Sequence, residues 1–220
     1  FSSKIHPFNW RGIQDYGCGA LGDMACHIMD AAYWNLNLGA PTSVELKKID
    51  QKSTVAFPKS AVVEYQFPAR GKLPPVKYTW SDGGLIPPLP RELEFGRDLN
   101  PEAGTLLFGS KATVLCSFYY ETVRIIPEVK MREMAPSLPP KTIPRVKGGP
   151  FAEWLLGCKG GPKPGSNFEY SGPFTEAVLL ANVAIRSRRR IEWDSKAMKV
   201  TNNTGTPKAG SNKSANSTKR

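Results

Sequence analysis

The chain lacks the features by which several classes of protein are recognised from sequence alone. No uninterrupted apolar run approaches the ~18 residues that a membrane-spanning helix needs. The four cysteines form no Cys-x-x-Cys pair and there are only two histidines, so the spacing predicts no zinc site. We expect free, mostly buried thiols. The first residues contain no apolar segment of the secretory type, and no compartment is indicated.

Acidic residues are missing from the C-terminal end of the chain. Six of the cations and no Asp or Glu lie between 195 and 220, which leaves +5 of the net charge of +11 for the first 194 residues. Four arginines also cluster over 186–190, where cations suit the end of a helix. The tail has no aromatic residues interleaved with its cations, so we expect no nucleic-acid partner. Its composition predicts a disordered basic tail over 202–220, after one domain over 1–201.

The apolar periodicity predicts an α+β fold. Apolar residues recur at three- and four-residue steps from Leu21 to Leu36, which indicates a helix with Asp23 in its first turn. A later helix is expected to begin at Pro173, in the first turn. The other predicted elements are strands at 42–50, 61–67, 76–80, 105–108, 112–118, 122–126 and 190–194, and helices at 151–159 and 173–187. This order predicts an open, largely antiparallel β-sheet with helices on one face.

The segment from Gly17 to Gly22 matches the pattern G-x-G-x-x-G and opens a helix. A dinucleotide site would also need a buried strand before the first glycine and a second strand after the helix. Residues 9–16 are no buried strand, and no βαβ unit follows. These glycines therefore favour a close backbone approach, either to a ligand or to a packed neighbour.

Asp23 and His27 are four residues apart, so they share one face of the predicted helix, and Asp30 and Trp34 continue that stripe. An imidazole beside a carboxylate can exchange protons near neutral pH. The alternative is an ordinary ion pair on the surface of a helix. The preceding loop is rich in glycine and aromatic residues, which favours the catalytic alternative.

Several motifs resemble the C-terminal domain of the Gfo/Idh/MocA oxidoreductases, most closely its bacterial branch. The most specific are Trp-Arg-Gly at 10–12 and Gly-Ala-Leu-Gly-Asp-Met at 19–24. The resemblance covers about nine-tenths of the chain. Its segments are 8–12, 15–30, 39–45, 74–77, 80–85, 144–149, 167–173 and 191–202.

The resemblance implies a parent enzyme that uses NAD or NADP to oxidise or reduce a sugar, cyclitol or related polyol. The family's proton-transferring pair maps onto Asp23 and His27. Its Trp-Arg pair, which approaches cofactor and substrate, maps onto Trp10 and Arg11, and we expect Asp15 to help bind substrate with Arg11 and His27. The cofactor would be held mainly by a Rossmann domain absent from these residues. The sheet is expected to mediate homo-oligomerisation.

Two departures from the family leave other functions open. No Glu-Lys-Pro motif occurs, and Phe151 stands where related proteins usually carry a histidine. The chain by itself is therefore not established as an enzyme. One alternative is an NAD-dependent glycoside hydrolase on the same scaffold. The other is a non-catalytic module for oligomerisation or sugar binding.

Overall fold

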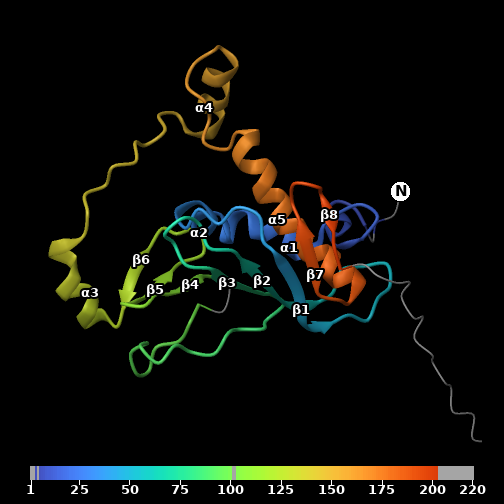
Figure 1. Ribbon diagram of the computed structural model, residues 1–220, viewed down its shortest axis with the longest axis horizontal. Coiled ribbons are helices and arrows are strands. Elements are labelled where there is room, and N and C mark those ends of the chain that lie inside the picture. The colour runs from blue at the N-terminus through green and yellow to red at the C-terminus, as the bar shows by residue number, and fades with distance from the viewer. Residues whose placement is uncertain (1–2, 4, 101–102, 203–220) are drawn as a thin grey trace, which may run out of the picture.

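The fold consists of helices packed on one face of an antiparallel sheet, with a smaller sheet beside it (Figure 1). The structure, a computed structural model, describes residues 3, 5–100 and 103–202. Its elements, in chain order, are the 3-10 helix η1 (Asn9–Gly12), α1 (Gly19–Ile28), α2 (Asp30–Asn35), β1 (Ser43–Asp50), β2 (Ser60–Phe67), β3 (Val76–Ser81), β4 (Thr105–Phe108), β5 (Thr113–Cys116), β6 (Val123–Ile126), α3 (Glu128–Met134), the 3-10 helix η2 (Ala135–Ser137), α4 (Gly149–Cys158), α5 (Phe168–Ser187), β7 (Ile191–Asp194) and β8 (Lys199–Val200).

The larger sheet has five strands in the order β3-β2-β1-β7-β8, and every neighbouring pair is antiparallel. Period-two patterning explains which side is covered. In β2, alternate residues from Ala61 to Phe67 are buried, whereas Glu64 and Gln66 between them are only partly buried. The α+β class and the antiparallel pairing predicted from the sequence are confirmed.

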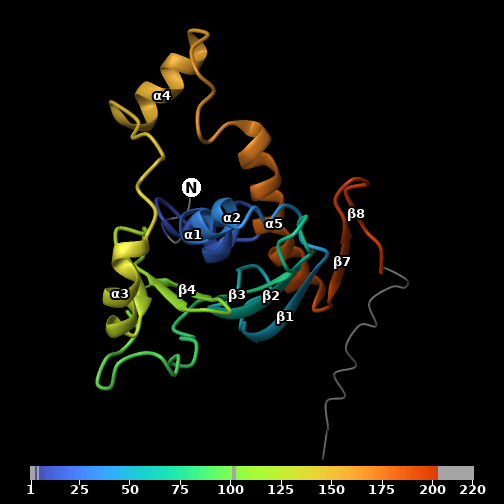
Figure 2. The same ribbon diagram turned by 60° about the vertical axis from the view of Figure 1, so that its left-hand side comes forward.

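Helices α1, α2 and α5 lie together over one face of this sheet (Figure 2). The core forms where their apolar stripes meet the inward residues of β1, β2, β3 and β7. Its largest fully buried side chains include Tyr65, Phe67 and Met29. In the part of the chain that is described, no helix combines the length and the apolar character that crossing a membrane would take.

The prediction of a single sheet is wrong in one respect. Strands β4, β5 and β6 form a separate three-stranded antiparallel sheet, reached from β3 by a proline-rich connection. Proline cannot donate to a ladder, so this connection does not extend the first sheet. Helix α3, which the pattern did not indicate, packs against β6.

The helix expected from Leu21 to Leu36 is two helices that meet at Met29. The carbonyl of Ile28 accepts hydrogen bonds from the hydroxyls of Thr105 and Tyr120, and side chains that insert into the backbone hydrogen-bond ladder in this way interrupt a helix. Helix α1 also begins at Gly19, so Asp23 lies beyond its first turn, contrary to the prediction.

Helix α5 begins five residues before the predicted start at Pro173. Asn167 caps it, since its side-chain oxygen accepts from the backbone N–H groups of Glu169 and Tyr170 at 3.1 and 3.2 Å. Pro173 is therefore the sixth helical residue and not in the first turn.

The C-terminal end of the domain extends further than predicted. Strand β8 was not expected, and Asn202, assigned to the tail, bonds to the backbone of Arg190 and Glu192. The rest of the predicted tail lies outside the described residues. All four cysteines are free, but only Cys116 is buried, so the expectation of mostly buried thiols is wrong.

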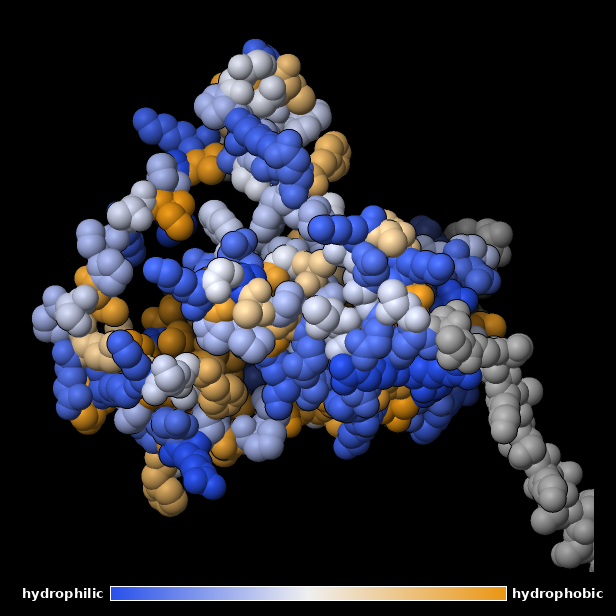
Figure 3. All heavy atoms as spheres, viewed as in Figure 1, coloured by the Kyte–Doolittle hydropathy of each residue, from blue (hydrophilic) through white to orange (hydrophobic). Residues whose placement is uncertain are grey.

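Helix α4 stands away from both sheets on an arm (Figure 2). None of its residues is buried, although Phe151, Trp154, Leu155 and Leu156 are large and apolar. Apolar residues are visible at the surface of this arm and around the smaller sheet (Figure 3).

Candidate functional site

The N-terminal segment that carries Trp10 and Arg11 is held against the loop between β1 and β2. Ile13 bridges Ala56, and the backbone N–H of Phe57 donates to the carbonyl of Gly12 at 2.8 Å. These bonds fix η1 beside α1, although η1 has no buried residue of its own.

The glycine-rich segment is filled by the chain itself. A Cβ at Gly17 would lie 2.4 Å from the carbonyl oxygen of Arg11, and one at Gly19 would lie 2.6 Å from the ring of Phe57. Gly19 also has a φ of +69°, which side chains rarely adopt. Of the two explanations for the close approach, the structure favours a packed neighbour.

The surroundings of that segment also exclude a dinucleotide-binding βαβ unit at this place. The element before Gly17 is a 3-10 helix, and α1 leads into another helix. Every strand pair of the two sheets is antiparallel.

Arg11 and Asp23 form an ion pair that joins η1 to α1. The Arg11 Nε lies 3.4 Å from Oδ2 of Asp23, and both side chains are partly exposed. The guanidinium also lies over the rings of Phe8 and Trp10, at 4.3 and 5.2 Å from their centroids, and its Nη1 donates to the carbonyl of Phe8. Ion pairs and cation–π contacts of this exposure contribute roughly 1 kcal/mol or less each.

Several contacts therefore hold Arg11 in one orientation. Its Nη2 makes no hydrogen bond within the described residues.

His27 lies one turn after Asp23 on α1 and is exposed. Its ring meets Tyr119 edge-on, with the centroids 5.7 Å apart and the planes at 90°. Within the described part of the chain, neither imidazole nitrogen has a hydrogen-bond partner. Asp23 and His27 thus share a face, as predicted, but the carboxylate of Asp23 pairs with Arg11 and not with the imidazole.

Tyr119 is a site residue that the sequence analysis missed. It comes from the turn between β5 and β6, and Tyr120 of that turn donates its hydroxyl to the carbonyl of Ile28 at the end of α1. Thr105 on β4 donates to the same carbonyl. A contact made across about ninety residues of sequence leaves no local pattern by which to find it.

The remaining members of the predicted stripe face another part of the molecule. Asp30 accepts a hydrogen bond from the hydroxyl of Tyr170 on α5 at 2.5 Å, and Trp34 packs near the same ring. Burial and the charge of Asp30 raise the pKa of Tyr170. Asp30 and Trp34 are thus structural links between α2 and α5.

Asp15 and Cys26 are two further polar residues close in sequence to the candidate site. Asp15 is exposed and has no hydrogen bond or ion pair within the described residues, so the structure does not bring it to Arg11. The thiol of Cys26 lies 3.2 Å from the carbonyl oxygen of Asp23, and partial burial together with the Asp23 and Asp30 charges raises its pKa. A protonated thiol is a weak nucleophile.

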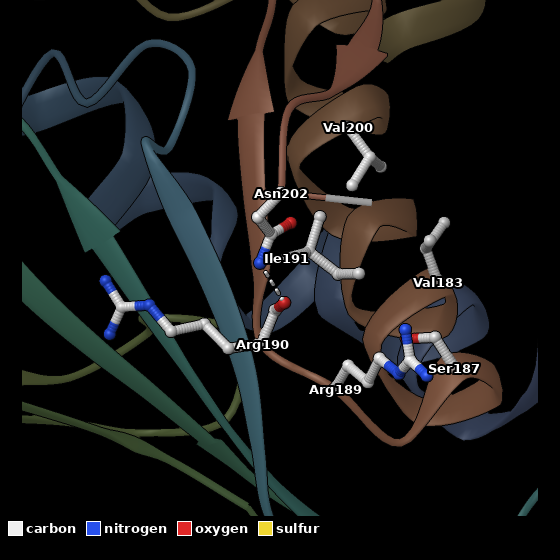
Figure 4. Close-up of a pocket in the computed structure, with 7 residues that line it drawn as sticks. All are labelled: Val183, Ser187, Arg189, Arg190, Ile191, Val200 and Asn202. Carbon is white, nitrogen blue, oxygen red and sulfur yellow. Dashed lines mark hydrogen bonds between the residues drawn. The ribbon is translucent and has the colours of Figure 1, made fainter. Parts of the chain in front are cut away.

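A small cavity of about 110 Å³ lies between the end of α5 and β7–β8 (Figure 4). Val183, Ile191 and Val200 supply its apolar side, while the side chain of Arg190 points away from them. Arg190 instead pairs with Glu45 and Glu192. None of the predicted site residues lines this cavity.

No protein-family model matches the chain, and a search of curated proteins finds no relative. The candidate site consists of a guanidinium, a carboxylate, an imidazole and two exposed aromatic rings, which lie on η1, α1 and the β5–β6 turn.

Proposed function

We propose that the face formed by Trp10, Arg11, Asp23 and His27 is the substrate side of an active site. The enzyme would be an NAD(P)-dependent oxidoreductase of the Gfo/Idh/MocA type that acts on a sugar, cyclitol or related polyol. The observation that carries this proposal is the exposed His27, whose imidazole has no hydrogen-bond partner in the described residues, one turn from the Arg11–Asp23 pair.

Each residue has a role in this proposal that follows from its chemistry. The imidazole of His27 takes the proton of the substrate hydroxyl as the carbon that bears it loses a hydride. The free Nη2 of Arg11 donates to a neighbouring substrate oxygen. Asp23 holds Arg11 in place, and the rings of Trp10 and Tyr119 present apolar faces to the carbon skeleton of the sugar.

A nicotinamide cofactor would supply the hydride acceptor when bound. Its phosphate groups do not fit the Gly17–Gly22 segment, because the chain's own backbone already fills the space at Gly17. The Gly17–Gly22 segment is therefore not the phosphate-binding loop in this proposal, and Trp10, Arg11, Asp23 and His27 contribute the substrate side.

The proposal includes self-association through the sheet. The face of the sheet away from the helices carries an ion-paired set of side chains, in which Lys47 contacts Glu45 and Glu64 at 2.7 and 4.0 Å. A second copy could dock on this face through similar polar contacts. Light scattering coupled to size exclusion tests this part, with a dimer or larger species expected and a monomer contradicting it.

The function is tested by incubating the complete gene product with NAD or NADP and a panel of sugars, cyclitols and polyols. The expected result is net formation of reduced nicotinamide with at least one of them. Release of the aryl group from an aryl glycoside, without net reduction of NAD, would identify the glycoside hydrolase instead. Activity on neither kind of substrate would contradict the proposal.

A further inference from the structure

A second, strongly basic cleft lies behind the loop between β1 and β2. Its volume is about 410 Å³, within the range of roughly 300–1,000 Å³ typical of small-molecule sites. It lies between that loop and the C-terminal end of α5, and none of Trp10, Arg11, Asp23 or His27 lines it. The lining residues are Gln14, Gln51, Lys52, Ser53, Thr54, Ile185, Arg186 and Arg188.

The charges of this cleft are not neutralised. Its lining holds three cations, Lys52, Arg186 and Arg188, and no carboxylate. None of the three has an ion pair within the described residues. Arg190, only two residues beyond Arg188, pairs with two glutamates. Gathering three unpaired cations around one cleft costs electrostatic free energy, which a bound anion would offset.

The helix end explains only part of this arrangement. Arg186 and Arg188 complement the partial negative charge of about half a unit at the C-terminus of α5. Lys52 comes from a loop and belongs to no helix end. Three full positive charges outweigh that half charge, so the net field in the cleft still favours an anion.

Arg188 occupies a backbone conformation in which glycine is the usual residue. It caps α5 with φ +55° and ψ +31°, the left-handed region that favours glycine at this position. Its guanidinium nevertheless reaches across to the side-chain oxygen of Gln51. An arginine at a position suited to glycine points to a role for its side chain.

The loop that forms the other wall is ordered by its own hydrogen bonds. The amides of Gln14 and Gln51 both donate to the carbonyl of Ala56, at 3.0 and 2.9 Å. The Ser53 hydroxyl oxygen accepts from the backbone N–H groups of Val55 and Ala56, so its own proton remains free to donate. The wall is therefore formed before any ligand arrives.

We propose that this cleft binds a small multivalent anion, a molecule that carries a phosphate or diphosphate group. Two guanidinium groups suit phosphate oxygens because each can donate two parallel hydrogen bonds, and Lys52 adds a third charge. The free Ser53 hydroxyl supplies a neutral donor. This inference does not depend on the proposed oxidoreductase function, because the two sites share no residue.

Calorimetric titration of the complete chain with inorganic pyrophosphate at low salt tests the proposal. We expect a Kd of about 1 mM or tighter, with orthophosphate binding more weakly. Lys52→Gln and Arg186→Gln should each weaken pyrophosphate binding about tenfold. The control Lys199→Gln removes the same charge from exposed strand β8 and should leave the Kd unchanged.

Arg188→Gly separates a binding role from a structural one. Glycine suits the left-handed backbone there, so the melting temperature should be equal or higher while pyrophosphate affinity falls about tenfold. Unchanged affinity in this variant would overturn the proposal. A Kd above about 10 mM, an equal loss in Lys199→Gln, or binding only of a single-stranded oligonucleotide would also overturn it.

Discussion

Helices α4 and α5 differ in a way that their composition does not explain. Helix α4 is the more apolar of the two on average, yet none of its residues is buried. Helix α5 buries one side against α1 and the five-stranded sheet, with Phe174 and Ile185 near the two ends of the buried stretch. The difference in burial follows from where each helix lies, because the connections on either side of α4 hold it away from both sheets (Figure 1). We call α1, α2, α5 and the five-stranded sheet the body, and α4 with the connections on either side of it the arm. The stability of the fold should therefore depend on the body and hardly at all on the arm.

Truncating Phe67 should produce the largest loss. It is 1% exposed and its ring contacts Tyr33 and Tyr65. Phe67→Ala should lower the free energy of unfolding by about 3–5 kcal/mol, because it removes buried apolar area and leaves a cavity. Urea denaturation measures this, and a loss below about 1 kcal/mol would show that the body is not packed as described.

A backbone test within the body compares two neighbouring glycines after β3. A Cβ at Gly83 would lie 2.2 Å from the carbonyl oxygen of Lys59, whereas one at Gly84 would meet nothing within 4 Å. Both have positive φ, so both alanine variants carry backbone strain. Gly83→Ala should cost about 2–3 kcal/mol and Gly84→Ala about 1 kcal/mol. Equal losses would contradict the contact between this turn and the start of β2.

Asp82 gives the body a distinctive pH dependence. Its carboxylate accepts from the N–H of Ala61 at 2.6 Å and from the indole of Trp80 at 3.0 Å, yet burial raises its pKa above the ordinary 3.8. The folded state therefore holds the proton more tightly than the unfolded state. Protonation of Asp82 therefore stabilises the folded state. This stabilisation is fully present below the pKa of Asp82 in the unfolded chain and is lost as pH rises through its pKa in the folded state.

Denaturation of the wild type and Asp82→Asn at several pH values between about 3 and 6 checks this sign. The stability of the wild type relative to the variant should fall as pH rises. A difference that grows with pH would mean that the hydrogen bonds to the carboxylate outweigh its burial.

The smallest effect is expected on the arm. Trp154 is 61% exposed, so Trp154→Ala should change the free energy of unfolding by less than about 0.5 kcal/mol. The same denaturation series measures it. A loss comparable to that of Phe67→Ala would mean that α4 packs against the body.

The sequence predicted those parts of the fold that are governed by local periodicity. The alternation in 61–67 placed β2 and its buried face, and the spacing of Leu21, Ala25 and Ile28 placed α1. The break at Met29 and the second sheet were missed, because both depend on contacts between residues far apart in the chain. Pro173 misled the prediction of where α5 begins, since the cap at Asn167 decides it.

The candidate site could be predicted only in part for the same reason. The helical spacing placed Asp23 and His27 on one face of α1, but no local pattern shows that Asp23 pairs with Arg11. The contact of Tyr119 with His27 depends on the β5–β6 turn, which the hydroxyl of Tyr120 joins to the carbonyl of Ile28 on α1. The sequence shows the cluster of arginines at 186–190 directly. It does not show that Lys52 lies beside them, because only the folded chain brings the β1–β2 loop to the end of α5.

The central claim is that the open imidazole of His27 transfers the substrate proton, and steady-state turnover of His27→Ala in the complete gene product tests it most directly. The account predicts that kcat falls by about 10²-fold or more, with little change in melting temperature, because the side chain is exposed. His6→Ala, which removes the other histidine, is the matched control and should retain normal kcat. Normal turnover in His27→Ala, or a loss of stability with turnover intact, would contradict the catalytic role.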